Sequence, residues 1–229
     1  MCGIVGYIGP KSPAPILIEG LKRLDYRGYD SSGIATMNGD GGIFLHKQAG
    51  RIQKLEESLP QDRPSASLGI AHTRWATHGL PSKRNAHPHA NDQVAVVHNG
   101  IIENYQELRE GLADKDVVYT SETDTEVVAH LVTDFLNQGL SPKEAVARTV
   151  PMLEGAFGLV MIFAGHPDVM IGARRGSPLA IGYGDGEMFF GSDALALAPM
   201  TRRISYLEEG DWAVVTPKGA EVFDTDGAP

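Results

Sequence analysis

The sequence predicts an α+β domain in which β-sheets pack face to face and are covered by helices. Helical patterns are grouped in the central part of the chain, whereas short apolar segments typical of strands occupy both ends. This grouping favours separate layers of sheet and helix. The chain has 229 residues, of which 42% are hydrophobic and 21% charged, and such a composition is that of a globular protein with a substantial core.

The N-terminal part of the chain predicts several strands and one helix. The apolar, β-branched stretch CGIVGYIG is typical of a buried strand. A helical pattern follows and ends at the glycine-rich segment YRGYDSSG; its apolar side comprises Ile16, Leu17, Leu21 and Leu24. Further strands are predicted at residues 33–48, 67–74 and 94–98, and short strands alternate with turns beyond residue 155.

Three helices are predicted in the central part. The first, NYQELREGL, follows a turn-like HNG. The second lies in SETDTEVVAHLVTDFLNQG, where Thr123 and Glu126 have the spacing of a capping box. The third lies in SPKEAVARTVPML, where Ser141 is a suitable N-cap, Pro142 fits the first helical position and Glu144 completes another capping box.

The composition excludes several classes of protein. The longest apolar runs are too short for a transmembrane helix, and the N-terminus lacks the basic flank and long apolar region of a secretory signal. A single cysteine excludes an intrachain disulfide and a cluster of cysteine metal ligands. The net charge of −9 argues against a nucleic-acid backbone as the main partner. We therefore expect a cytoplasmic protein that binds neither nucleic acid nor membranes.

Cys2 is the most informative residue of the sequence. A lone cysteine is most often a small buried hydrophobe, but position 2, followed by Gly3, suits removal of Met1. Removal would leave an α-amino group with a pKa of about 7.7–8.0 beside a thiol with a pKa of about 8.5. The amine could accept the thiol proton, so that nucleophile and base would belong to one residue suited to attack on a carboxamide. If Met1 is retained, the base is an amide and this mechanism fails.

The dipeptide Asn99-Gly100 admits two interpretations. An acyl-transfer site needs an oxyanion hole. Asn99 offers an amide donor for one, and Gly100 permits an unusual backbone conformation that can aim its N–H into a pocket. Taken alone, the dipeptide favours a plain Asn-Gly turn.

Arg74 and Asp124 are candidates for holding the two ends of an amino acid. The forked guanidinium of Arg74 matches a carboxylate bidentately, and Asp124, at the start of a predicted helix, could hold an ammonium group. A surface salt bridge for Arg74 and a favourable helix-dipole position for Asp124 account for these residues equally well.

Five of the eight histidines cluster in the middle of the sequence: His72, His78, His87, His89 and His98. The cluster invites a metal-site interpretation, but no HExxH motif or comparable carboxylate spacing accompanies it. The neighbouring Asn and Thr residues are poor zinc ligands. We predict no catalytic metal and no organic cofactor.

Several long motifs together resemble a known family. They are MCGIVGYIG, RLDYRGYDSSGIA, GIAHTRWATHGLPSKRNAHPH, VVHNGIIENYQELRE, SETDTEVVAHLV, RRGSPLAIG and LEEGDWAVV. Over essentially the whole chain, these motifs are similar to class II glutamine amidotransferases. YRGYDSSG and the tryptophan of HTRWATHG are most similar to the glutaminase domains of glucosamine-6-phosphate synthases. The resemblance implies a four-layer αββα sandwich of the N-terminal nucleophile hydrolase type, with residues 1–229 forming a single glutaminase domain.

The resemblance also implies the roles of individual residues. Cys2 becomes the N-terminal nucleophile after removal of the initiator methionine, and Asn99 with the Gly100 amide forms the oxyanion hole. Arg74 grips the α-carboxylate of glutamine, and Asp124 holds its α-amino group.

Three further residues take their roles from the same resemblance. Thr77 and His78 lie in a loop that closes over glutamine and make polar contacts with it. Trp75, in that loop, gates the passage of ammonia towards a partner domain.

Partners follow from the same comparison. Enzymes of this type continue into sugar isomerase domains that bind fructose 6-phosphate and accept the ammonia, and the full-length proteins are expected to be homo-oligomers. The chain stops before such domains, so we expect it to hydrolyse L-glutamine without making glucosamine 6-phosphate. The alternatives are the glutaminase domain of another class II amidotransferase, or a non-catalytic glutamine-binding module if Met1 is retained.

Overall fold

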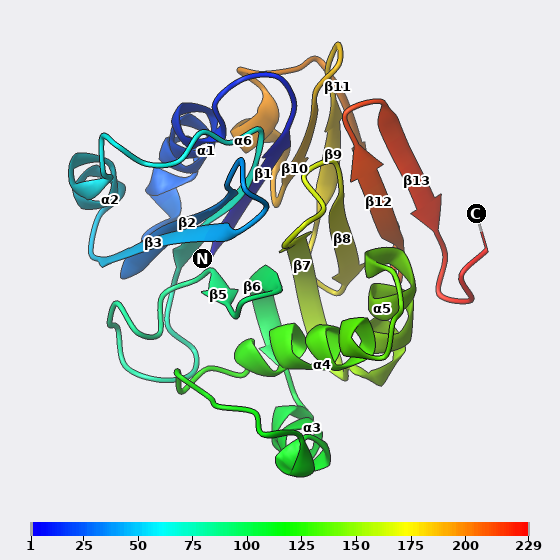
Figure 1. The fold of residues 1–229 in the computed structure, drawn as a ribbon. Helices are drawn as coiled ribbons and strands as arrows, with labels where there is room; N and C mark the ends of the chain where they lie inside the picture. The colour runs from blue at the N-terminus through cyan, green and yellow to red at the C-terminus, as the bar shows by residue number, and fades with distance from the viewer. Residues whose placement is uncertain (1, 229) are drawn as a thin grey trace.

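Two β-sheets lie face to face between two layers of helices (Figure 1). The computed structural model describes residues 2–228, apart from the side chain of Arg27. The expected removal of Met1 concerns a residue outside those described. Helices α1 (Pro13–Lys22) and α2 (Ile52–Ser58) cover the outer face of one sheet, and α4 (Glu126–Asn137) and α5 (Pro142–Thr149) cover the outer face of the other.

The chain runs through one sheet, then through the other, and then returns once to each. The helices are α1 (Pro13–Lys22), α2 (Ile52–Ser58), α3 (Tyr105–Gly111), α4 (Glu126–Asn137), α5 (Pro142–Thr149) and α6 (Ala194–Leu197). The seven-stranded sheet has the order β11 (Arg203–Tyr206), β9 (Ala180–Tyr183), β10 (Met188–Gly191), β1 (Gly3–Ile8), β4 (Leu68–Arg74), β2 (Ser31–Met37) and β3 (Ile43–Ala49). The six-stranded sheet has the order β13 (Gly219–Phe223), β12 (Trp212–Thr216), β8 (Met170–Arg175), β7 (Gly155–Phe163), β6 (Val94–Ile102) and β5 (His89–Ala90).

Successive side chains of the central strands point to opposite faces and contribute to three separate apolar cores. In β1, Ile4 enters the core between the sheets, whereas Val5 packs with the residues of α1. In β6, Val97 enters the core between the sheets and Val96 packs with residues of α4. Both faces of these strands are buried, which explains why their sequences are continuously apolar rather than alternating. The predicted αββα sandwich is confirmed.

Most predicted elements are found, with some differences at their boundaries. The strand at the N-terminus is β1, the helix after it is α1, and NYQELREGL forms α3. Residues 33–48 are divided between β2 and β3, which pair with each other. The segment ISYLEEGDWAVV contributes β11 and β12, and these belong to different sheets. The short helices α2 and α6 were not predicted.

The two predicted capping boxes have different outcomes. The box at Ser141 is confirmed, because the Ser141 side chain accepts from the Glu144 N–H and the Glu144 side chain accepts from the Ser141 N–H. The box at Thr123 is wrong: α4 begins at Glu126, after Thr125. The Glu126 carboxylate instead accepts hydrogen bonds from the loop before the helix, including the Thr120 N–H at 2.7 Å.

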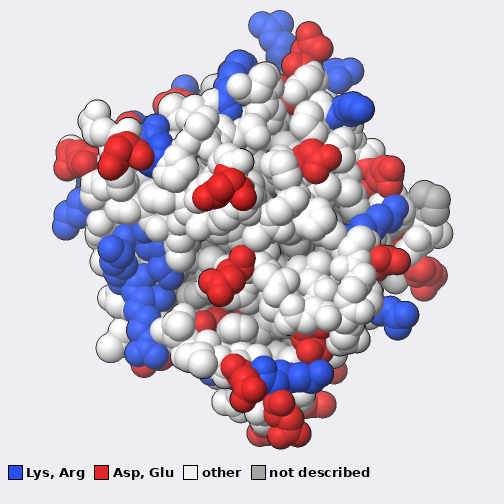
Figure 2. Space-filling view, in the orientation of Figure 1, with Lys and Arg blue, Asp and Glu red and all other residues white. Residues whose placement is uncertain are grey.

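Charged side chains are scattered over the surface. Figure 2 shows separate carboxylates across one face, with a group of basic side chains gathered at its left edge in that view. That face has no broad basic surface. Within residues 2–228, no helix has the length and apolar character needed to cross a membrane.

Ser141→Ala should reduce the free energy of unfolding by about 1 kcal/mol, because α5 would lose a side chain that satisfies one of its first N–H groups. Urea unfolding monitored by circular dichroism measures this loss. Ser141→Asp, which also accepts from the helix N-terminus, is the matched control and should retain most of the stability. Equal destabilisation by both variants would contradict the capping role.

Candidate active site

Residues from both sheets surround one cavity beside Cys2. Cys2 immediately precedes β1 in the seven-stranded sheet, and Asn99 and Gly100 belong to β6 in the six-stranded sheet. The cavity has a volume of about 550 Å³, and Trp75 and Thr77 also line it. The structure therefore brings together residues that are almost one hundred positions apart in the chain.

The Cys2 thiol is held by the backbone of Trp75. Its Sγ accepts a hydrogen bond from the Trp75 N–H at 3.2 Å and lies 3.6 Å from the Trp75 carbonyl oxygen. Burial raises the pKa of the thiol, and the hydrogen bond from the Trp75 N–H offsets part of this shift. The thiol is protonated at neutral pH, so a nucleophilic role requires a base.

Asn99 and Gly100 lie inside a strand and do not form the expected turn. Asn99 pairs with Gly158, and Gly100 with Phe157, in the antiparallel ladder between β6 and β7. Pairing with a strand that is remote in sequence overrides the local preference of Asn-Gly for a turn.

Gly100 has a conformation that suits glycine alone. Its φ is +128°, and a Cβ atom there would lie 2.0 Å from the carbonyl oxygen of Ala156. Asn99 Nδ2 donates to the Cys2 carbonyl oxygen at 3.3 Å. An amide donor and a glycine backbone therefore stand beside the thiol, which is an arrangement that acyl transfer can use.

Arg74 and Asp124 line a second, much smaller cavity with Cys2 at its boundary. Its volume is about 10 Å³, roughly the space of a single water-sized probe. Arg74 is buried, unlike the residue of a surface salt bridge, and its Nη2 donates to the carbonyl oxygens of His78 and Gly79. Backbone carbonyl oxygens of the following segment thus serve as partners of the buried Arg74 guanidinium.

Asp124 is anchored to the strand that carries Asn99. Its Oδ2 accepts from the Ile102 N–H at 2.7 Å and lies 3.9 Å from His98 Nδ1. These contacts direct the buried carboxylate towards β6. A favourable interaction with the dipole of α4 would not by itself require Asp124 to accept a hydrogen bond from β6.

The segment after β4 carries the remaining predicted residues. Trp75 is 56% exposed at the cavity mouth, and Thr77 lines both cavities. The His78 ring lines neither cavity; it packs edge-on against Tyr105, with 5.6 Å between ring centroids.

Asp30 is a residue of this site that the sequence analysis missed. Its Oδ2 accepts from the Ala76 N–H at 2.6 Å, and its Oδ1 lies 3.9 Å from Arg74 Nη1. Asp30 thereby fixes the start of the segment that closes over Arg74. Its setting, YDSSG, is equally typical of a turn, so no sequence signal distinguished it.

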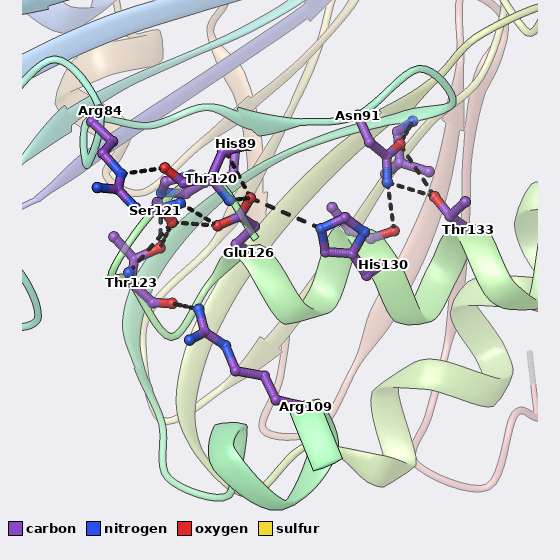
Figure 3. A network of polar contacts seen from close by, with 12 residues as sticks. Arg84, His89, Asn91, Arg109, Thr120, Ser121, Thr123, Glu126, His130 and Thr133 are labelled. Carbon is purple, nitrogen blue, oxygen red and sulfur yellow. Dashed lines mark hydrogen bonds and ion pairs between the residues drawn. The ribbon is translucent and has the colours of Figure 1, made fainter. Parts of the chain in front are cut away.

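A network of hydrogen bonds around Glu126 holds the loop that precedes α4 and contains Asp124; Figure 3 shows this network. Thr120 and Ser121 each donate to the Glu126 carboxylate through both the backbone N–H and the hydroxyl. Burial raises the pKa of Glu126, but the hydrogen bonds and the contact with His130 outweigh burial and hold the pKa well below its usual range. The carboxylate is therefore ionised, and it holds the loop in one conformation.

Four buried histidines pack behind the cavity. The His87 ring lies 4.3 Å from that of His72, 4.7 Å from that of His89 and 6.4 Å from that of His98, measured between centroids. Burial lowers the pKa of all four, that of His72 to about 3. They are neutral at physiological pH. Within residues 2–228, no group of three or more His, Cys, Asp or Glu is arranged to hold a metal ion.

Comparison with known proteins assigns the family. Residues 72–199 match the model of the glutamine amidotransferase domain. The chain belongs to this family. It is 53% identical over its whole length to the glutamine–fructose-6-phosphate aminotransferase [isomerizing] of Gluconobacter oxydans. It is 56% identical over 99% of its length to the enzyme of that name from Bradyrhizobium diazoefficiens. The chain spans only 38% and 37% of these relatives.

Solved structures of glutamine amidotransferases have a similar fold. Glutamine phosphoribosylpyrophosphate amidotransferase from B. subtilis superposes with a TM-score of 0.81 and 25% identity, over 98% of this chain and 49% of that one. A class-II glutamine aminotransferase domain protein from Silicibacter pomeroyi superposes with a TM-score of 0.64 over the full length of both chains. Its 16% identity supports the likeness of fold alone.

The neutral histidines should make the protein sensitive to acid. Their pKa values are lower in the folded state than the ordinary 6.5, so the unfolded chain binds more protons below that pH. The stability they contribute is therefore present above pH 6.5 and lost as the pH falls towards the folded pKa values. Each additional proton bound by the unfolded chain should cost about 1.4 kcal/mol of unfolding free energy per pH unit.

Urea unfolding at a series of pH values between about 7.5 and 5 measures this dependence. His87→Gln should lower the slope of the unfolding free energy against pH by the contribution of one histidine. His166→Gln, which changes an exposed histidine, is the matched control and should leave the slope unchanged. A stability independent of pH over this range would show that the buried rings are not held neutral.

Proposed function

We propose that this chain hydrolyses L-glutamine to glutamate and ammonia through a γ-glutamyl thioester on Cys2. The observation that carries the proposal is the position of the thiol: it shares one cavity with Asn99 and Gly100 and borders a second with Arg74 and Asp124. A nucleophile, two oxyanion donors and two opposite charges are the groups that hydrolysis of an amino-acid carboxamide needs. Membership of the glutamine amidotransferase family supports the same reaction.

The proposed reaction begins with attack of Cys2 Sγ on the side-chain carboxamide carbon of glutamine. The α-amino group of Cys2, free after removal of Met1, accepts the thiol proton as the S–C bond forms. The carbonyl electron pair moves to oxygen, where Asn99 Nδ2 and the Gly100 N–H donate to it.

Collapse of the tetrahedral intermediate breaks the C–N bond. The protonated α-amino group gives its proton to the departing nitrogen, and ammonia leaves. Water then attacks the thioester, and the α-amino group accepts a proton from that water. The C–S bond breaks, glutamate departs, and the protonated α-amino group returns its proton to the Cys2 sulfur. Every step uses groups of this chain and water, without a metal or organic cofactor.

Binding of glutamine requires the segment after β4 to move. In the structure, two backbone carbonyl oxygens accept hydrogen bonds from the Arg74 guanidinium. The cavity that Arg74 and Asp124 line is too small for an amino acid. We propose that Arg74 receives the α-carboxylate and Asp124 the α-amino group, with Thr77 and His78 closing over the bound molecule. Trp75, exposed at the mouth, would control the exit of ammonia.

The similar proteins support a role of this chain in amino-sugar formation. We propose that residues 1–229 form one glutaminase domain, and that the ammonia serves sugar isomerase domains that convert fructose 6-phosphate to glucosamine 6-phosphate. Identities of 53–56% to proteins named for that reaction favour it over phosphoribosylpyrophosphate as acceptor, where the identity is 25%. Such a full-length enzyme would be a homo-oligomer. The requirement for a free thiol suits the reducing cytoplasm.

Intact-mass measurement tests the proposed nucleophile. After incubation with a diazoketone analogue of glutamine, the chain should have lost Met1 and gained one adduct, because the free Cys2 thiol attacks an electrophile held in the glutamine pocket. Cys2→Ala should form no adduct. A processed chain without an adduct would contradict the proposed function, and an adduct on a chain that keeps Met1 would exclude the α-amino group as the base.

Arg74→Lys should raise KM for glutamine about tenfold or more while kcat changes little, because a lysine ammonium cannot bind the carboxylate bidentately. Steady-state ammonia release measures both constants. Arg202→Lys, at an exposed position, is the matched control. An unchanged KM for Arg74→Lys would remove Arg74 from the binding site.

A further inference from the structure

His72 connects the two sheets directly behind Asn99. It lies in β4 of the seven-stranded sheet and is completely buried. Its Nε2 is 2.9 Å from Asn99 Oδ1 and 2.9 Å from the carbonyl oxygen of His98, both in β6. A carbonyl oxygen can only accept, so Nε2 must carry the proton, and it donates to both oxygens.

This proton determines which way the Asn99 amide points. Because Nε2–H is a donor, the amide turns its oxygen towards His72 and its nitrogen towards Cys2. The contact of Asn99 Nδ2 with the Cys2 carbonyl oxygen agrees with this orientation. The opposite orientation would present the amide oxygen to the cavity, where it would repel an oxyanion.

The tautomer and position of His72 are themselves fixed. Its Nδ1 has no hydrogen-bond partner and is buried, and its ring stacks on His87. Burial lowers the pKa of the ring to about 3, so it stays neutral with the single proton on Nε2 throughout the physiological range.

We propose that His72 is a positioning residue for the reaction, whose Nε2–H holds the Asn99 amide with its nitrogen aimed at the oxyanion. The inference rests on the proposed function, in which Asn99 donates to that oxyanion. Loss of the donor would leave Asn99 Oδ1 and the His98 carbonyl oxygen, which both accept from Nε2, without that shared proton. Rotation of the amide would make up for this loss by letting Nδ2 donate to His98, which removes it from the active site.

Two amide variants of position 72 provide a matched pair. Gln places its amide nitrogen near the position of Nε2 and can donate to Asn99, whereas Asn is too short to do so. His72→Asn should lower kcat for glutamine by about 10- to 100-fold with KM little changed, against about 10²–10³-fold for Asn99→Ala. His72→Gln should restore most of the activity.

Two further measurements separate positioning from a loss of structure. Alkylation of Cys2 by iodoacetamide displaces iodide at a saturated carbon and forms no oxyanion, so its rate should be unchanged in His72→Asn. In the Asn99→Ala background, the change from His to Asn at position 72 should lower kcat by less than about twofold, because no amide is left to orient.

The outcomes distinguish a failure of the positioning role of His72 from a failure of the oxyanion role of Asn99. Wild-type kcat in His72→Asn, or losses that multiply in the double variant, would overturn the positioning role while leaving Asn99 as the oxyanion donor. Slowed alkylation in His72→Asn would also overturn it, since the defect would then lie in the structure around the thiol. Wild-type turnover in Asn99→Ala would overturn the oxyanion assignment on which the proposal rests.

Discussion

The candidate site depends on the packing of the two sheets against each other. Cys2 leads into a strand of one sheet, whereas Asn99 and Gly100 belong to a strand of the other. Apolar side chains from both sheets fill the space between them and set their separation. Hydrogen bonds cross between the two sheets at the site, from Asn99 to the Cys2 carbonyl oxygen and from His72 to Asn99 and the His98 carbonyl oxygen. Dispersed apolar packing brings the strands together, and these polar contacts set the orientation of the Asn99 amide beside Cys2.

Polar contacts hold two of the chain segments that flank the site. Glu126 holds the loop before Asp124, and Asp30 holds the segment after Arg74. Buried polar groups are costly unless they are paired, yet Nδ1 of His72 and Nε2 of His98 are buried without a hydrogen-bond partner. Remaining neutral limits the cost of burying these rings, since an unpaired imidazolium would be far more expensive. The result is a neutral imidazole at His72 that donates to Asn99 in a fixed direction and adds no charge beside the amide.

Local chemistry in the sequence predicted some elements well and misled at others. The capping box at Ser141 uses only neighbouring residues, and the buried strand β1 is recognisable from its own apolar run. The turn expected at Asn99-Gly100 is instead a strand, because its partner Phe157 is remote in sequence. Resemblance to the family predicted which residues lie around Cys2, but it assigned no role to Asp30 or to His72. Their roles follow from contacts across a sheet or between sheets, which no periodicity records.

The position of the segment after β4 follows from the electrostatics of Arg74. A buried guanidinium needs partners, and in the structure it finds two backbone carbonyl oxygens and, at 3.9 Å, the Asp30 carboxylate. Its Nη1 has no hydrogen bond. A carboxylate in place of the two carbonyl oxygens would bring a full negative charge and a bidentate geometry to the same group. Under the proposed function, the α-carboxylate of glutamine would displace the backbone from Arg74, and the segment after β4 would then be free to fold over the bound substrate.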